Sequence, residues 1–422
     1  MNKLQNTLGI VITMLAIFLG SHFLKSDLLF LRLLLGLGLG YALTRGYMGF
    51  AGSVNRAYRG GSTQLMQVLM MMFLITAIIN SGFLLLEKTP QLHLWILPIN
   101  LGIIIGGLLF GFGMSFSSCC ASGVMTDLVT DLPRASVTLL FFGLGVFVGF
   151  PLGKGPHSLS IITDSWFETS GHYAQAYHGV FLPDLFGTGL MSYLGAILLT
   201  TLFAMIMIHL SKKYQAYRAQ QNTLHGIESE IEQEKIAQKE QSNASIKFFS
   251  KENYIQLFVT PWSMKLSAMV IIVIFTIMLA STKMGWGASV PFGVWFGQIL
   301  VFLGVPIESV AQFSSRPIAM YAKPFFENQI SVQNFGIVIG TLICVLLMGK
   351  ATLKQKFTIK SLGWFALGGF CMGFGTRFSN GCNVGALYTP IANLSLSGWI
   401  FLIFIIIGGI IGNQTTEKLK IK

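Results

Sequence analysis

Charged residues are scarce in this chain of 422 residues. Asp, Glu, Lys and Arg make up 10% of it and apolar residues 53%, whereas soluble domains carry roughly 25% charged residues. So few charges cannot cover a surface that faces water, which excludes a cytosolic enzyme, a soluble nucleic-acid-binding protein and a secreted disulfide scaffold. The mean hydropathy of +0.67 indicates an integral membrane protein. Its net charge of +12 then reflects lysine and arginine kept on the cytoplasmic side of the membrane.

Cysteine is also rare, and its spacing lacks a metal or redox pattern. The chain has five cysteines, none in a C-x-x-C arrangement, and seven scattered histidines. A zinc site and a thioredoxin-like motif therefore have no support, and we expect neither a metal nor another cofactor. The sequence also lacks the glycine-rich Walker A pattern that cradles the phosphates of ATP.

Long apolar segments are abundant instead. Ten of them approach the ~20 residues that cross a bilayer as a helix, and we predict an all-α polytopic membrane protein with about ten transmembrane helices. No small-residue cleavage pattern follows the first segment, which favours an uncleaved anchor. The predicted spans are 7–23, 28–44, 64–86, 94–115, 134–153, 185–209, 264–284, 333–349, 361–378 and 395–413.

A hydrophilic segment divides these spans into two groups. Residues 211–252 are rich in Gln, Lys and Glu, which is typical of a solvated, partly helical linker, and we assign it no chemistry. The predicted organisation is an N-terminal transmembrane half (1–210, with the extra spans 7–23 and 185–209), a cytoplasmic linker (211–260) and a C-terminal transmembrane half (261–422).

The short loops predict the orientation of the chain. If the first residues lie inside the cell, short cytoplasmic segments hold twelve Lys and Arg, and the opposite segments hold six. Positive residues are retained on the cytoplasmic side. We therefore expect a multi-pass protein of the cell (inner) membrane with both termini in the cytoplasm.

An internal repeat is present. Residues 106–123 read GGLLFGFGMSFSSCCASG and residues 368–385 read GGFCMGFGTRFSNGCNVG, with nine of eighteen positions identical. In the predicted topology the two copies run in opposite directions, which is the inverted-repeat arrangement of transporters. Each copy is followed by a stretch too short to span, 120–131 and 382–393, which we interpret as a re-entrant half-helix. Weaker elements at 45–52 and 283–289 extend the repeat.

Half-helices inside a membrane have a chemical consequence. Their first N–H groups have no partner within the helix, so they must be buried in protein or line a polar cavity. Ser117, Ser118, Ser379 and Asn380 are good N-cap types at the two predicted starts. Such helix N-termini attract anions. Cys120 and Cys382 occupy the same position in both copies, which indicates function, whereas Cys344 is interpreted as a packing residue.

These segments resemble the YeeE/YedE family of sulfur-transport membrane proteins, whose studied member takes up thiosulfate. The resemblance rests on the two repeats and extends to the 45–52 and 285–287 elements. It implies an hourglass-shaped bundle with inverted repeats, in which cysteine thiols pass a solute along by S–H···S hydrogen bonds. A third family cysteine is expected within 45–52, where this chain has Met48. The predicted path residues are Cys119, Cys120, Cys371, Cys382, Ser118, Ser379, Asn380, Gly123, Gly385 and Met48.

The resemblance implies a transporter for a small sulfur-containing anion, with thiosulfate as the first candidate. The predicted spans contain no Asp or Glu, so the usual carboxylate for proton or sodium coupling is missing, which favours facilitated or weakly coupled passage. Two alternatives stay open: a transporter of a selenium or other sulfur species, and a membrane enzyme that exchanges persulfides or disulfides at Cys119 and Cys120. We favour a transporter over an enzyme. A cytosolic sulfur-handling protein is a candidate partner, and nucleic acid is not.

Overall fold

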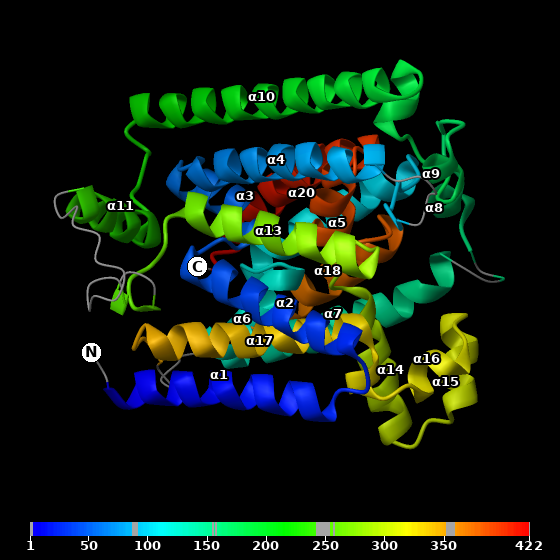
Figure 1. The fold of residues 1–422 in the computed structure, drawn as a ribbon, viewed down its shortest axis with the longest axis horizontal. Helices are drawn as coiled ribbons and strands as arrows, with labels where there is room; N and C mark the ends of the chain where they lie inside the picture. The colour runs from blue at the N-terminus through cyan, green and yellow to red at the C-terminus, as the bar shows by residue number, and fades with distance from the viewer. Residues whose placement is uncertain are drawn as a thin grey trace.

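The computed structural model describes residues 3–86, 92–153, 156, 158–241, 254–255, 258–351 and 359–421 (Figure 1). In this part of the chain the regular structure is helical, so the predicted all-α fold is confirmed. Nine helical runs among the described residues are long and apolar enough to cross a membrane. The tenth predicted span also forms a helix, α18, which is not among these nine. The long helices are α1 (Lys3–Phe23), α2 (Asp27–Arg45), α4 (Gln64–Leu86), α5 (Leu101–Ser117), α7 (Leu132–Gly153), α10 (Leu190–Gln220), α13 (Met264–Thr282), α17 (Gln329–Leu347), α18 (Ile359–Phe378) and α20 (Leu396–Lys418).

Short helices follow the breaks and fill the loops between these long helices. The predicted half-helices appear as α6 (Ala121–Thr130) and as η3 (Asn383–Tyr388) continued by α19 (Thr389–Ala392), and the weaker repeat elements lead into α3 (Phe50–Gly60) and α14 (Val290–Phe302). The remaining elements are α8 (Ser160–Thr163), α9 (His172–Gln175), η1 (Leu182–Phe186), α11 (Glu228–Gln241), α15 (Ile307–Ser314), α16 (Ile318–Ala322) and η2 (Phe325–Glu327).

The bundle has two distinct ends. At one end, on the left of Figure 1, α1 begins, α20 ends and α11 lies; we refer to it as the terminal face. The opposite end carries α8, α9, α15 and α16 and is referred to as the far face. Helices α1 and α10 lie at the two outer edges of the view. Only 17% and 22% of their most apolar stretches are buried inside the protein. Such exposed apolar surface is suited to lipid.

The two repeated segments run antiparallel and touch through glycine. A Cβ atom added at Gly106 would lie 2.6 Å from the amide N of Ser379, and one added at Gly113 would lie 2.5 Å from the carbonyl O of Gly368. Residues later in α5 therefore contact residues earlier in α18, so the two helices are antiparallel. This close approach is available because glycine has no side chain. The antiparallel repeat predicted from the sequence is thus found at the centre of the fold.

Each repeat copy also packs on a helix of the other half. Helix α5 lies against α20, and α18 lies against α7. Position Gly408 on α20 abuts the backbone of Leu108, and Gly369 on α18 abuts the backbone of Thr138. The two halves are therefore interlocked, and the helix breaks are held at their shared interface.

Candidate functional site

The two helix breaks have the same local geometry. Ser118 after α5 and Asn380 after α18 both have left-handed backbone, with φ of 56° and 55°. The hydroxyl of Ser117 donates to the carbonyls of Gly113 and Cys119, and that of Ser379 donates to the equivalent carbonyls of Gly375 and Gly381. Duplicated serines therefore fix both breaks, because their hydroxyls satisfy carbonyls that the interrupted helices leave unpaired.

The N-cap positions after both breaks are occupied by cysteines, which corrects the assignment to Ser117, Ser118, Ser379 and Asn380. Cys120 is the N-cap of α6, and its Sγ accepts a hydrogen bond from the amide N of Gly123 at 3.4 Å. Cys382 occupies the N-cap position of η3, a π-helical turn. N-caps are usually hydroxyl, carboxylate or amide side chains. The sequence analysis therefore chose the serines and the asparagine next to each cysteine, and these residues form the break instead.

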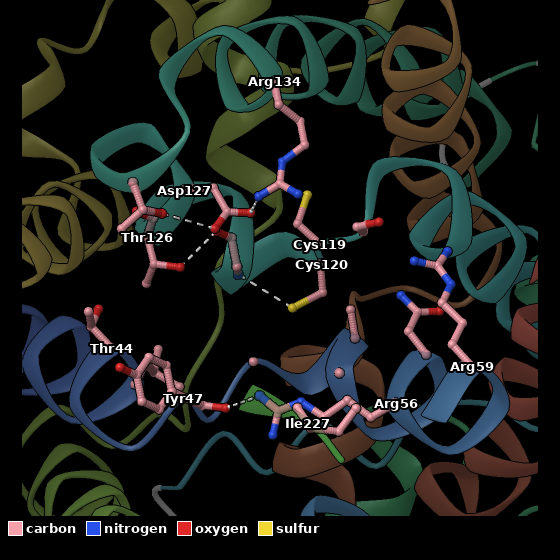
Figure 2. Close-up of a pocket in the computed structure, with 18 residues that line it drawn as sticks. Thr44, Tyr47, Arg56, Arg59, Cys119, Cys120, Thr126, Asp127, Arg134 and Ile227 are labelled. Atoms are coloured by element: carbon pink, nitrogen blue, oxygen red, sulfur yellow. Dashed lines mark hydrogen bonds and ion pairs between the residues drawn. The ribbon is translucent and has the colours of Figure 1, made fainter. Parts of the chain in front are cut away.

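A cavity of about 570 Å³ reaches Cys120 from the terminal face (Figure 2). One wall is α6, from Cys120 through Gly123 and Thr126 to Thr130 at its end. The other wall comes from the end of α2 and from α3. The complete lining is Leu43, Thr44, Tyr47, Gly49, Ala51, Gly52, Asn55, Arg56, Arg59, Ser118, Cys119, Cys120, Gly123, Thr126, Asp127, Thr130, Arg134 and Ile227.

The cavity lining holds more basic than acidic side chains. It contains three arginines, Arg56, Arg59 and Arg134, and one carboxylate, Asp127. Arg134 pairs with Asp127 at 3.1 Å and with Asp131 at 3.0 Å, and Arg56 pairs with Glu230. Arg59 instead donates to neutral groups, the side chain of Asn413 and the carbonyl of Ser115. Because the N-terminus of α6 adds further positive potential, the arrangement can hold a small anion close to a thiol.

Asp127 changes an expectation drawn from the sequence. It belongs to the predicted half-helix 120–131, and the absence of carboxylates was inferred from the ten predicted spans alone. The structure includes it in α6, within the continuous apolar stretch Leu101–Thr130 and facing the cavity. The reason is that the half-helix continues beyond the break for ten residues, so a residue just before the next span still belongs to the interrupted one.

The predicted path residues do not all come together. Ser118, Cys119, Cys120 and Gly123 line the cavity. Cys382, Ser379 and Gly385 are buried at the second break. These three and the remaining three all lie outside the cavity lining. Of the remaining three, Met48 is fully buried in the hydrophobic core, Cys371 is half-buried on α18, and Asn380 is exposed.

Trp95 packs against the second break. The Cys382 thiol interacts with the hydroxyl of Ser289, which precedes α14. The ring of Trp95 reaches within 2.7 Å of a Cβ added at Gly287 and within 3.8 Å of one added at Gly385. Trp95 therefore lies between the two elements that flank Cys382.

Asn383, which sequence reasoning missed, lies next to Cys382. Its side chain is fully buried, and neither its amide N nor its amide O has a hydrogen-bond partner among the described residues. A buried amide without partners is costly, so this residue is a candidate solute ligand. The sequence signal was present, because Asn383 follows the duplicated cysteine, but its repeat equivalent is Ala121.

The hydrophilic segment also contributes to the terminal face. It was predicted to be solvated, yet Glu230 on α11 is buried and lies 3.2 Å from Arg56 Nη1, and its other oxygen accepts from Ser62. Gln233 donates to the carbonyls of Gly46 and Trp262. The described part of this segment is therefore docked against the cavity wall, because it carries carboxylate and amide groups that match polar groups at the ends of α2 and α3.

A second ion pair holds α11 at its exposed edge. Lys350 Nζ lies 2.7 Å from Glu232 Oε1 and donates to the hydroxyl of Tyr47 at 3.1 Å. Burial disfavours the charged form of Lys350, but its bonds to Glu232 and Tyr47 outweigh this and raise its pKa above the ordinary value. Lys350 therefore stays charged and keeps α11 next to Tyr47, a cavity-lining residue.

The fold and the site define a class of protein. Interlocked inverted repeats, helices broken inside the bundle and a polar cavity that ends at one break are features of membrane transporters.

The model of the sulphur transport family matches residues 45–411, and the chain belongs to that family. It is 23% identical over 336 residues to the thiosulfate transporter TsuA of Spirochaeta thermophila, covering 77% of this chain and 81% of that protein. It is 22% identical over 392 residues to the thiosulfate transporter TsuA of Escherichia coli, covering 89% and 91%.

Proposed function

We propose that this protein takes up thiosulfate through the inner membrane, from the far face to the terminal face. The observation that carries the proposal is the pair of equivalent helix breaks, each with a cysteine at the start of the following helix. Relatives named thiosulfate transporters cover most of the chain, which supports this solute over a selenium or other sulfur species.

The chemistry of the breaks suits a sulfur oxyanion. Thiosulfate carries hard oxygens and one soft terminal sulfur. The backbone N–H groups at the start of α6, together with Arg59, can donate to the oxygens, and the Cys120 and Cys382 thiols can contact the sulfur. Asn383 can donate to an oxygen at the second break. We propose that the solute passes from Cys382 to Cys120 and leaves through the cavity.

The proposed orientation places the terminal face in the cytoplasm. It rests on the excess of Lys and Arg in the short segments at that end. The cavity then opens to the cytoplasm, and Trp95 covers the second break on the outer side. This arrangement corresponds to an inward-open state, and we propose that a cytosolic sulfur-handling protein receives the solute there.

Uptake by purified protein in liposomes tests the proposal. We expect labelled thiosulfate to accumulate, and unlabelled thiosulfate to compete better than selenate. Cys382→Ser should lower the rate more than tenfold, roughly the loss of one strong contact. Cys371→Ser is the matched control, because that thiol lies within helix α18, before the break at which Cys382 lies.

The competing enzyme function predicts a different result. A thiol-exchange enzyme would release altered sulfur species from thiosulfate in detergent solution, where no compartment exists. That release, or equal uptake rates for wild type and Cys382→Ser, would overturn the proposal.

A further inference from the structure

Two arginines near the far face contact the same aromatic ring. Arg377, at the end of α18, and Arg316, between α15 and α16, lie with their guanidinium carbons 5.5 Å and 4.7 Å from the ring centroid of Phe150 on α7. Phe150 is fully buried. Cation–π contacts of this kind hold a planar guanidinium in a fixed orientation.

Neither arginine has an acidic partner. The ion pairs among the described residues include neither Arg377 nor Arg316. Arg377 is 7% exposed, its Nε donates to the hydroxyl of Thr376, and its Nη2 has no hydrogen-bond partner in the described part of the chain. Burial also lowers the pKa of Arg316 below its ordinary value. A buried cation without a carboxylate, as Arg377 is, is costly. The charge of the partly buried Arg316, which contacts the same ring, adds repulsion to that cost.

The position of Arg377 is built into the surrounding helices. A Cβ atom added at Gly149 on α7 would lie 2.5 Å from Arg377 Cγ, so the absence of a side chain at Gly149 makes room for the arginine. Arg377 also lies close enough to Cys382 for the charge and the thiol to interact. Its guanidinium also shares the ring of Phe150 with Arg316, which lies between the far-face helices α15 and α16, so it lies on the far-face side of the second break.

We propose that Arg377 and Arg316, oriented by Phe150, form a binding site for a small divalent oxyanion that loads the path toward Cys382. An anion that contacts both guanidinium groups offsets their repulsion and supplies the acceptor that Arg377 Nη2 lacks. The inference rests on the proposed thiosulfate uptake for the identity of the solute. The site itself requires only oxyanion chemistry.

The test uses full-length protein in liposomes and in detergent. We expect Arg316→Gln and Arg377→Gln each to raise the KM for labelled thiosulfate about tenfold, roughly one lost charged contact, while Vmax changes less than about twofold. Arg377→Lys keeps the charge without the planar fork, so its KM should lie between wild type and Arg377→Gln. Lys323→Gln removes an exposed far-face cation that is not part of the site, and its KM should equal that of wild type.

Direct binding separates this inference from the proposed function. Labelled thiosulfate should bind detergent-solubilised wild type more tightly than either Gln variant, at equal monodispersity. If wild-type liposomes take up no thiosulfate but this binding difference persists, the proposed function fails and the anion site stands. Wild-type affinity and KM in both Gln variants, or the same KM rise in Lys323→Gln, would overturn the anion site.

Discussion

Replacing Cys120 by serine separates the two roles that the structure gives this residue. Its Sγ caps α6 by accepting from the amide N of Gly123, and it lines the cavity. Serine keeps a capping acceptor, whereas alanine loses it, and losing an N-cap costs about 0.5–2 kcal/mol. Sulfur is a weak acceptor, so we expect Cys120→Ala to cost about 0.5 kcal/mol, at the low end of that range, and Cys120→Ser to retain wild-type stability.

Transport should follow a different order. If the thiol contacts the soft sulfur of the solute, a hydroxyl cannot replace it, and Cys120→Ser should lose more than tenfold in uptake, as Cys120→Ala does; tenfold corresponds to ~1.4 kcal/mol. The measurements are uptake of labelled thiosulfate into liposomes and the midpoint of thermal unfolding in the same detergent. Cys344→Ala is the control, because that thiol donates to Met348 outside the cavity lining. Wild-type uptake by Cys120→Ser would refute the sulfur contact and leave only a capping role.

Three further predictions follow from particular contacts. Glu230→Gln removes the carboxylate beside Arg56 and should expose α11 to limited proteolysis. Glu234→Gln, on the exposed side of the same helix, should not. Equal cleavage in both variants would contradict docking through Glu230. Asn383→Ala removes a buried amide that lacks hydrogen-bond partners among the described residues, and burying such a group costs about 1–3 kcal/mol. The midpoint of thermal unfolding should therefore hold or rise, while thiosulfate uptake falls. A lower midpoint with normal uptake would show that Asn383 has a structural role. Gly106→Val places carbon against the backbone of α18 and should reduce the amount of folded protein, measured as monodisperse material, by more than Gly82→Val, where a Cβ meets nothing within 4 Å.

The sequence by itself determined the class of the protein and the location of its helix breaks. Apolar runs of spanning length mark transmembrane helices because a bilayer requires them locally. The duplicated glycine, serine and cysteine pattern likewise marked Cys120 and Cys382, since a helix break depends on a few consecutive residues. These properties are local, so the order of residues is enough to find them.

Only the tertiary structure decided which charges meet. The hydrophilic composition of residues 211–252 predicts a solvated linker. In the structure, however, Glu230 in this segment lies against Arg56 on α3. The fold also brings Arg377 and Arg316 together on the ring of Phe150, although they lie in different segments of the sequence. Such groups come from segments far apart in the chain. Their partners depend on how the two halves interlock, which composition and spacing do not encode.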